Sequence, residues 1–332
     1  MTQRGNTIRL ALFGPGGFGQ ERARAMQTNP YIDFVACYSP IESERLACQR
    51  DFGARAVEKE NEIWDDPEID GVVLSTPNQI HLEQTRLAAE SGKHVFVEKP
   101  IAPDIADARR MIADCDKAGV VLMVGHNSRR RNRIRQMKKF LNEGVLGQPL
   151  AAEAHNSHAG GLAIQPDDWR WSPKNCPGGP LSQLGIHHAD SLQYLLGPVA
   201  RVTAWQRRLA VKAEIDDTTM ALLEFENGAL GYLGACYAIP DLRYVHVLGT
   251  RANVRWDRAM GLVLESERGR EQVPFVENDT VQEEIDEFAQ CILNGTSPEV
   301  GGREALAALA VIEAAVLSGQ RGQPVDMTEL LA

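Results

Sequence analysis

The chain has 332 residues, 43% of them hydrophobic and 24% charged, and its formal net charge at pH 7 is −10. That length is enough for two domains with separate cores, and the acidic balance argues against nucleic acid and anionic membrane surfaces as general partners. No apolar run approaches the ~18 residues of a membrane span, and residues 1–7 are too short and polar for a secretory signal. We therefore expect a cytoplasmic protein.

The cysteine pattern predicts neither disulfides nor a metal site. Six cysteines are scattered along the chain, with no C-x-x-C and no neighbouring histidine at zinc spacing. Most are interpreted as small core residues in a reducing compartment. Cys176, which lies between Asn175 and Pro177, is expected to be inert, with a reactive thiol as the alternative.

Apolar runs alternate with helical patterns over the first part of the chain. Strands are expected at residues 8–13, 33–38, 71–75, 94–97 and 120–124, and helices at 42–52, 80–91 and 105–118. Parallel strands joined through helices place those helices on both faces of a sheet. The rhythm therefore predicts an α/β fold with a doubly wound, Rossmann-type parallel sheet over residues 1–126.

A glycine-rich loop follows the first expected strand. Gly14, Gly16 and Gly19 match G-x-G-x-x-G, in which one glycine makes the turn, one lets a pyrophosphate approach and one allows the helix to pack on the strand. Such a loop alone is also a common tight turn, but the strand–loop–helix context favours a dinucleotide cradle facing a helix N-terminus. The loop residues assigned to the cofactor are Gly14, Gly16, Gly17, Phe18 and Gly19.

The end of the second expected strand bears on the choice of cofactor. An Asp or Glu there usually binds the adenosine ribose, whereas this chain has Ser39 followed by Pro40. A neutral hydroxyl does not repel a 2′-phosphate, and Arg45 is the nearest cation on the following helix. The sequence therefore favours NADP(H) over NAD(H).

A lysine follows the fourth expected strand, in the run Glu98-Lys99-Pro100. Ligands of open α/β sheets bind at the carboxyl ends of the strands, so the Lys99 ammonium is placed to hydrogen-bond a reacting oxygen and move its proton. The alternative is that Lys99 only pairs with Glu98.

After residue 126 the pattern of alternating strands and helices ends. Short alternating runs recur between 199 and 273, separated by turn residues such as Asn227 and Gly228, and helical patterns at 280–293 and 303–318 close the chain. Residues 127–332 are therefore expected to form an α+β domain with a large, open, mostly antiparallel sheet. Apolar residues on that sheet predict at least a dimer formed through it.

Gln183 and His187 are the strongest candidates in this second part. Leucines between 180 and 196 suit a helix buried on one side, and residues four apart share a helix face. Because an amide does not ionise, the general base would be His187 or Lys99, and Gln183 would orient a hydroxyl. The alternative for His187 is a satisfied core histidine. His188 and Asp190 are interpreted as structural.

Three weaker signals leave alternatives open. The arginine run at 129–135 is typical of a solvated face, although Arg129 or Arg130 could bind an anionic group. His155 and His158 are expected to be solvent-exposed, or else to contact substrate rather than metal. Trp169 would stack on a sugar face or anchor the core.

The chain resembles the glucose-fructose oxidoreductase, inositol dehydrogenase and rhizopine-catabolism (Gfo/Idh/MocA) family over nearly its whole length. The resemblance is carried, in order, by the glycine loop, Thr76-Pro77-Asn78 with His81, Glu98-Lys99-Pro100, the stretch at 178–197, and the closing segment IEAAVLSGQRGQPV. It implies that the lysine of Glu-Lys-Pro is catalytic and that Thr-Pro-Asn lines the nicotinamide side of the groove. His81 and Glu98 are assigned to the cofactor site with these motifs.

The family commonly presents an aspartate and a histidine to the substrate, and this chain departs from that pattern because Gln183 stands at the aspartate position. The resemblance implies an NAD(P)-dependent oxidoreductase that transfers a hydride between the nicotinamide and a secondary hydroxyl or ketone of a sugar, polyol, inositol or related cyclic compound. The alternatives are a lyase or glycosidase that retains its cofactor, and a non-catalytic dinucleotide-binding protein. The substrate contacts assigned are Lys99, Arg129, His155, Trp169, Gln183 and His187.

Overall fold

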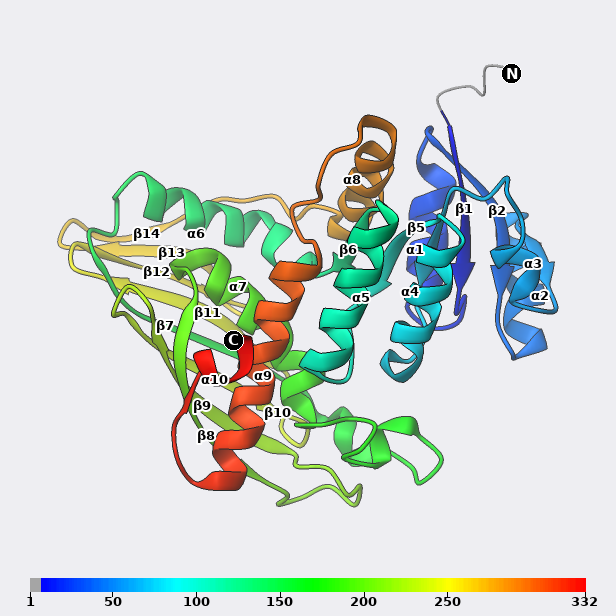
Figure 1. The fold of residues 1–332 in the computed structure, drawn as a ribbon. Helices are drawn as coiled ribbons and strands as arrows, with labels where there is room; N and C mark the ends of the chain where they lie inside the picture. Colours follow the sequence, from blue (N-terminus) through cyan, green and yellow to red (C-terminus); the bar gives the residue numbers. More distant parts are fainter. Residues whose placement is uncertain (1–6) are drawn as a thin grey trace. The chain divides into compact units, whose positions relative to one another are not determined.

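The computed structural model describes residues 7–332, which form two compact units (Figure 1). The first unit runs to Asn127 and takes in Asp279–Leu306, and the second comprises Ser128–Asn278 and Ala307–Ala332.

The first unit is built on a six-stranded parallel sheet. Its strands lie in the order β3-β2-β1-β4-β5-β6. Strands β1, β4, β5 and β6 are rich in buried apolar residues, as expected of parallel strands covered on both faces, whereas β2 and the short β3 are mostly half-buried. The predicted doubly wound sheet is confirmed. The strands are β1 (Ile8–Phe13), β2 (Ile32–Tyr38), β3 (Arg55–Val57), β4 (Gly71–Leu74), β5 (His94–Glu98) and β6 (Leu122–Gly125).

Local sequence signals explain where the helices of this unit begin and end. The Asp104 side chain accepts a hydrogen bond from the Asp107 N–H at the start of α5, and Gly119 ends that helix in the left-handed conformation. Gly53 ends α2 in the same way. The helices are α1 (Gly19–Thr28), α2 (Glu42–Phe52), α3 (Asn61–Trp64), α4 (His81–Glu90), α5 (Ile105–Ala118) and α8 (Thr280–Asn294), with the short 3₁₀ turn η1 (Asn78–Ile80). The 3₁₀ turn η2 (Asn127–Arg130) begins at the last residue of this unit's first segment and continues into the second unit.

Helix α8 belongs to the first unit although it lies far along the chain. Phe288 of α8 meets Phe96 of β5 edge to face with ring centroids 5.8 Å apart, and Gln282 hydrogen-bonds the main chain of α1. The sequence-based boundary assigned residues 279–306 to the second domain, whereas the structure packs them with the parallel sheet.

The second unit contains a nine-stranded sheet in the order β14-β13-β12-β11-β7-β10-β9-β8-β15. Neighbouring strands are antiparallel except β10 and β7, which pair in parallel. The strands are β7 (Pro149–Ser157), β8 (Val199–Arg207), β9 (Thr218–Phe225), β10 (Leu230–Cys236), β11 (Leu242–Gly249), β12 (Ala252–Asp257), β13 (Gly261–Ser266), β14 (Gly269–Gln272) and β15 (Val325–Asp326).

Helices cover one face of this sheet. They are α6 (Asn132–Asn142), α7 (Ile186–Leu196), the part of α9 (Gly302–Arg321) that lies in this unit, and the short α10 (Thr328–Leu331). Three short turns, η3 (Ala159–Ala163), η4 (Trp169–Trp171) and η5 (Leu181–Gly185), lie between β7 and α7.

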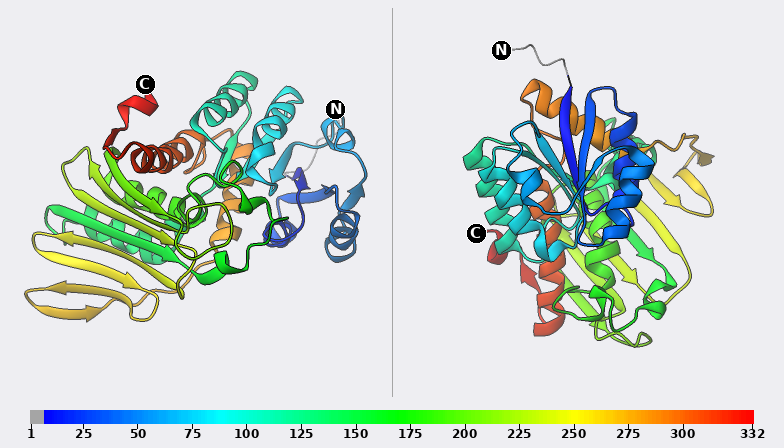
Figure 2. Two further views of the ribbon diagram at one scale, coloured as in Figure 1. Left: turned by 90° about the horizontal axis from the view of Figure 1, so that it is seen from below. Right: turned by 90° about the vertical axis from the view of Figure 1, so that its right-hand side faces the viewer.

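The other face of the nine-stranded sheet carries no described helix of this unit, and we call it the outer face (Figure 2). Alternation along β9 separates the two faces: Leu223 and Phe225 are buried beneath the helices, while Met220 and Leu222 are 51% and 52% exposed. The outer face therefore carries an exposed apolar patch, formed by Trp205, Met220, Leu222 and Leu230, beside the ion pair of Arg201 and Glu224.

Within residues 7–332, no helix is both long enough and apolar enough to cross a membrane.

Candidate active site

Three loops of the first unit lie at the carboxyl edge of neighbouring strands. The glycine loop follows β1, Thr76 follows β4, and Lys99 follows β5, and these three strands are adjacent in the sheet. Open α/β sheets bind ligands at this edge. The predicted cofactor residues and Lys99 are thus brought to one place within this unit.

The glycine loop has the close contacts that a dinucleotide cradle requires. Gly14 has φ +77°, and a Cβ there would lie 2.5 Å from the main-chain oxygen of Ser75. A Cβ on Gly19 would lie 3.0 Å from the main-chain carbon of Gly14, so only glycine lets α1 begin this close to the loop. The loop fits a pyrophosphate approaching the N-terminus of α1.

His81 joins two of these loops. Its ring is 1% exposed, with Nε2 2.9 Å from the Thr76 oxygen and Nδ1 3.0 Å from the Ile101 oxygen. Burial lowers the pKa of His81, although the neighbouring carbonyl groups act in the opposite direction. The ring thus joins the Thr76 loop to the segment after Lys99, and the predicted cofactor contact of His81 stays a prediction.

Glu98 is held by an arginine that the sequence analysis missed. Arg22 of α1 is fully buried and donates to Glu98 at 2.6 Å and to Glu284 of α8 at 2.7 Å. Its guanidinium also lies 4.4 Å from the centre of the Phe96 ring. Glu98 therefore has a structural ion pair within the sheet edge, and Pro100 follows Lys99 through a cis peptide bond.

Ser39, at the end of β2, has a charged neighbour that the sequence did not predict. Ser39 is 2% exposed, and its hydroxyl donates to the carboxylate of Glu44 at 2.6 Å. Arg45 donates to the main-chain oxygen of Ser39 at 3.3 Å. A carboxylate thus lies beside the residue whose neutrality favoured NADP(H).

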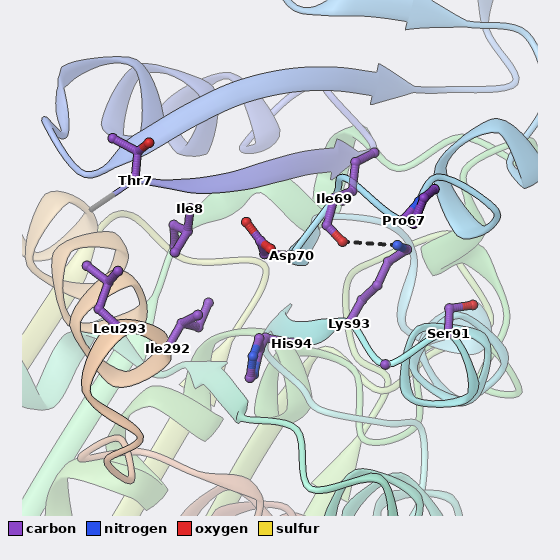
Figure 3. Close-up of a pocket in the computed structure, with 11 residues that line it drawn as sticks. Thr7, Ile8, Pro67, Ile69, Asp70, Ser91, Lys93, His94, Ile292 and Leu293 are labelled. Carbon is purple, nitrogen blue, oxygen red and sulfur yellow. Dashed lines mark hydrogen bonds between the residues drawn. The ribbon is translucent and has the colours of Figure 1, made fainter. Parts of the chain in front are cut away.

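A hollow of about 470 Å³ lies at the opposite edge of the parallel sheet (Figure 3). It is bordered by Ile8, Asp70 and His94, which stand at the amino ends of their strands, and the Lys93 ammonium there donates to the Ile69 oxygen at 3.0 Å. Because it lies away from the glycine loop and Lys99, this hollow is not the cofactor cradle.

In the second unit, Gln183 and His187 stand where a π-helical turn meets an α-helix. Gln183 belongs to η5, which is π-helical, and is 9% exposed, while His187 is half-buried in the first turn of α7. The sequence predicted one continuous helix, and the wider π turn is the departure from it. Such turns are frequent at functional sites.

The residues that follow His187 have structural surroundings, as expected. Burial lowers the pKa of His188 to about 3, so its imidazole is neutral in the folded protein. Asp190 accepts a hydrogen bond from Arg129 at 2.8 Å, and both side chains are buried. This ion pair gives Arg129 a role within the core of the unit, and its predicted substrate contact stays a prediction.

The arginine run is not a solvated face. Arg129, Arg130 and Arg133 are 7%, 4% and 7% exposed. Arg129 pairs with the buried Asp190, and Arg133 pairs with Glu277 and stacks 3.8 Å from the Trp256 ring centre. A cavity of about 40 Å³ is lined by Arg131, Arg133 and Arg243 together with His188. The expectation of a solvated face is therefore wrong for these three residues.

His155 lies on the outer face of the sheet. Its ring stacks with Tyr232 and Tyr244 at 6.3 and 5.7 Å between centroids, whereas the next residue, Asn156, reaches the Leu184 oxygen on the helical face. The sheet thus separates the His155 ring from Gln183. His155 is only 7% exposed, so the expectation of solvent exposure is wrong for it, and its predicted substrate contact stays a prediction.

Trp169 and Cys176 contribute to one small apolar cluster. Cys176 is fully buried there with Ile215 and Tyr237, and Trp169 packs against the cluster with Arg170 stacked 4.3 Å from its ring centre. The core-anchoring alternative for Trp169 has a structural basis, and sugar stacking stays a prediction. The inert interpretation of Cys176 agrees with its burial.

A dinucleotide cradle with a lysine on a neighbouring strand end, joined to a second α+β unit, defines the class as an NAD(P)-binding oxidoreductase. Two family models match the chain: one described as "Oxidoreductase family, NAD-binding Rossmann fold" over residues 8–126, and one described as "GFO/IDH/MocA C-terminal domain" over residues 134–255. The chain belongs to the Gfo/Idh/MocA family of oxidoreductases, which confirms the resemblance predicted from its motifs.

Named relatives cover most of the chain. A 1,5-anhydro-D-fructose reductase from Ensifer adhaerens is 29% identical over 82% of this chain and 84% of its own length. A 2,7-anhydro-N-acetylneuraminate hydratase from Escherichia coli is 28% identical over 98% of both chains. A solved structure from Desulfitobacterium hafniense, whose name assigns it to the NADPH-dependent oxidoreductases, has a TM-score of 0.94 and 31% identity and covers 99% of this chain and 100% of its own.

Relatives and neighbours use both forms of the cofactor. A levoglucosan dehydrogenase structure holds NADH, whereas a D-xylose 1-dehydrogenase from Haloarcula marismortui is named for NADP(+). Family membership therefore establishes NAD(P) binding without a preference.

Proposed function

We propose that this protein transfers a hydride between a nicotinamide cofactor and a secondary hydroxyl or ketone of a sugar, polyol, inositol or related cyclic compound. The observation that carries the proposal is the alignment of the glycine loop, Thr76 and Lys99 along adjacent strand ends of the first unit. Membership in a family of sugar and inositol oxidoreductases supports the substrate class.

The residues divide the work as follows. Gly14, Gly16 and Gly19 bring the main chain to the pyrophosphate, and when bound the nicotinamide ring supplies the hydride acceptor or donor. Lys99 donates a hydrogen bond to the reacting oxygen and holds its proton as the C–O bond order changes.

His187 completes the proton transfer, and Gln183 orients a substrate hydroxyl. An amide both donates and accepts hydrogen bonds but does not titrate, so Gln183 leaves His187 as the ionisable group of the second unit in this role. The presence of both Lys99 and His187 argues against the non-catalytic alternative.

The proposal is tested with a panel of sugars, inositols, sugar acids and dihydrodiols against both cofactors, followed by absorbance of the reduced nicotinamide. Lys99→Ala and His187→Ala are each expected to lower turnover by about 10² to 10⁴ while cofactor binding is kept. Lys117→Ala, on the exposed side of α5, is the matched control and should leave turnover unchanged. Normal turnover of Lys99→Ala would contradict the assignment.

A second candidate is a hydratase, lyase or glycosidase that retains its nicotinamide. The full-length similarity to a 2,7-anhydro-N-acetylneuraminate hydratase supports it, and so does the missing family aspartate at Gln183. Transient oxidation of a substrate hydroxyl acidifies a neighbouring C–H bond, and the electrons return before product leaves. Product formation with cofactor still bound and no net absorbance change would select this candidate over the dehydrogenase.

The cofactor preference and the assembly are finer proposals. Ser39 by itself favours NADP(H), while the adjacent Glu44 carboxylate favours NAD(H). For assembly, the apolar patch on the outer face supports a homodimer or homotetramer in which a second copy covers it. Light scattering at micromolar concentration tests this, and a monomeric mass would refute it.

A further inference from the structure

A carboxylate borders the middle of the glycine loop. A Cβ built on Gly16 would lie 2.7 Å from Cδ and 3.1 Å from Oε2 of Glu44, which places this carboxyl group against the main chain that a dinucleotide must approach. The same Oε2 accepts the Ser39 hydroxyl at 2.6 Å. Glu44 thus fills the space between the end of β2 and the loop, where an Asp or Glu at position 39 would otherwise place its own carboxylate.

The start of α2 explains how Glu44 reaches this position. The helix begins at Glu42, so Glu44 lies in its first turn, and helical side chains lean toward the helix N-terminus. Ser39 fixes the approach from the other side, because its oxygen also accepts the Ile41 N–H at 3.1 Å. The carboxylate is therefore directed back toward the strand end and away from the outer turn of the helix.

We infer that Glu44 binds the adenosine ribose hydroxyls and makes the protein prefer NAD(H) to NADP(H). The inference rests on the proposed function, since it needs the glycine loop to be the dinucleotide cradle. An ionised carboxylate accepts hydrogen bonds from two neighbouring hydroxyls, whereas it repels the dianionic 2′-phosphate of NADP(H). This reverses the preference that Ser39 alone predicted.

The nearest cation does not offset that repulsion in the structure. Arg45 donates to the main-chain oxygen of Ser39 at 3.3 Å, and its other terminal nitrogen is 4.0 Å from the Glu42 carboxylate. Its side chain is 14% exposed, so it is held along the helix start. With the carboxylates of Glu42 and Glu44 close by, and the Arg45 guanidinium already engaged, this part of the cradle is unfavourable for the dianionic 2′-phosphate of NADP(H).

The test measures dinucleotide affinity directly, by calorimetric titration of the whole protein with NADH and with NADPH. The wild type should bind NADH at least tenfold more tightly than NADPH. Glu44→Gln keeps the shape of the side chain and removes its charge, and it should lower that ratio by about tenfold or more, chiefly through tighter NADPH binding. Glu44→Asp, which keeps the charge, should retain a preference for NADH.

Glu42→Gln is the matched control, because it makes the same change two residues earlier on the same helix at a side chain that is 73% exposed. It should leave the NADH/NADPH ratio within about twofold, in line with the small effects of exposed charges. A ratio that moves equally in both variants would mean that general charge, and not the position of Glu44, sets the preference, and would overturn the inference.

The outcomes separate the two proposals. Tighter binding of NADPH by the wild type, or an unchanged ratio in Glu44→Gln, overturns the role of Glu44 while the oxidoreductase assignment stands. Weaker NADPH binding on Arg45→Gln, with Glu44→Gln silent, would give the selecting role to Arg45. Failure of either dinucleotide to bind a folded wild type would overturn the cradle itself and the inference with it.

Discussion

Replacing Arg22 with methionine should destabilise the first unit strongly. The guanidinium is fully buried between two carboxylates whose side chains are 10% exposed at Glu98 and 0% at Glu284. Burial by itself would lower the pKa of Arg22, but the two carboxylates outweigh it and raise the pKa above its ordinary value. Arg22→Met removes the countercharge of both and keeps most of the packing on Phe96.

Breaking a buried ion pair by removing one partner costs about 3–5 kcal/mol, because the remaining charge stays buried without compensation. For a domain of this size each kcal/mol lowers Tm by about 2–4 °C, so the expected loss is about 6–20 °C in a thermal melt. Arg24→Met is the matched control on the same helix. Its pair with Glu21 is half exposed, and the loss should be under about 1 kcal/mol.

A second substitution separates charge from packing. In the Arg22→Met background, Glu284→Gln removes the more deeply buried orphaned charge and should recover part of the lost Tm, with a coupling energy above about 0.5 kcal/mol. If Arg22→Met melts no lower than Arg24→Met, or if Glu284→Gln adds its own full loss, the two carboxylates do not depend on Arg22 and the reasoning is refuted.

Further predictions concern the cradle, the second unit and its outer face. Gly16→Val should abolish dinucleotide binding in calorimetry while the circular dichroism spectrum is unchanged, because the added side chain fills the pyrophosphate approach. Leu222→Lys should shift the light-scattering mass to that of a monomer, since it charges the outer face. Gln183→Asp should add or shift one limb of the pH–rate profile without abolishing turnover. As pH falls from about 6.5 toward 3, His188 becomes protonated in the unfolded chain but stays neutral in the folded one, so the free energy of unfolding should fall. In urea titrations at pH 7 and pH 5, His188→Asn should make the free energy of unfolding less dependent on pH.

Local signals were sufficient for five of the six strands of the parallel sheet. Helices expected at 42–52 and 105–118 have those bounds in the structure, because each is followed immediately by a glycine in the left-handed conformation. Strands β1, β4, β5 and β6 are short buried apolar runs, which the sequence displays directly, whereas the three-residue strand β3 was not predicted. Motif order then placed the glycine loop and Lys99 at one sheet edge.

Long-range charge pairing could not be read from the chain. Arg129 meets a carboxylate 61 residues later, at Asp190, and Arg22 meets one 262 residues later, at Glu284. A run of arginines looks solvated until such partners are known, since unpaired guanidinium groups are rarely buried. The sequence also could not predict on which face of the sheet the His155 side chain lies. Alternation along a strand defines two faces but does not show which of them the helices cover.

At the end of β2, the residue type at one motif position is a weaker guide to cofactor preference than the group that occupies the space beside the glycine loop. Ser39 has a neutral hydroxyl, and for that reason the sequence predicted that a 2′-phosphate would be tolerated. The cofactor contacts whichever group fills the space beside Gly16. In this chain that group is Glu44, which lies in the first turn of α2, five residues after Ser39. This position depends on the helix starting at Glu42, four residues past the end of β2 at Tyr38, so that its third residue points back over the loop. Inserting one alanine between Ile41 and Glu42 should therefore move the Glu44 carboxylate away from the loop. The preference for NADH over NADPH should weaken, even though Glu44 is retained. An unchanged ratio of NADH to NADPH affinity in that variant would show that the charge of Glu44, and not its placement by the helix start, governs the choice of cofactor.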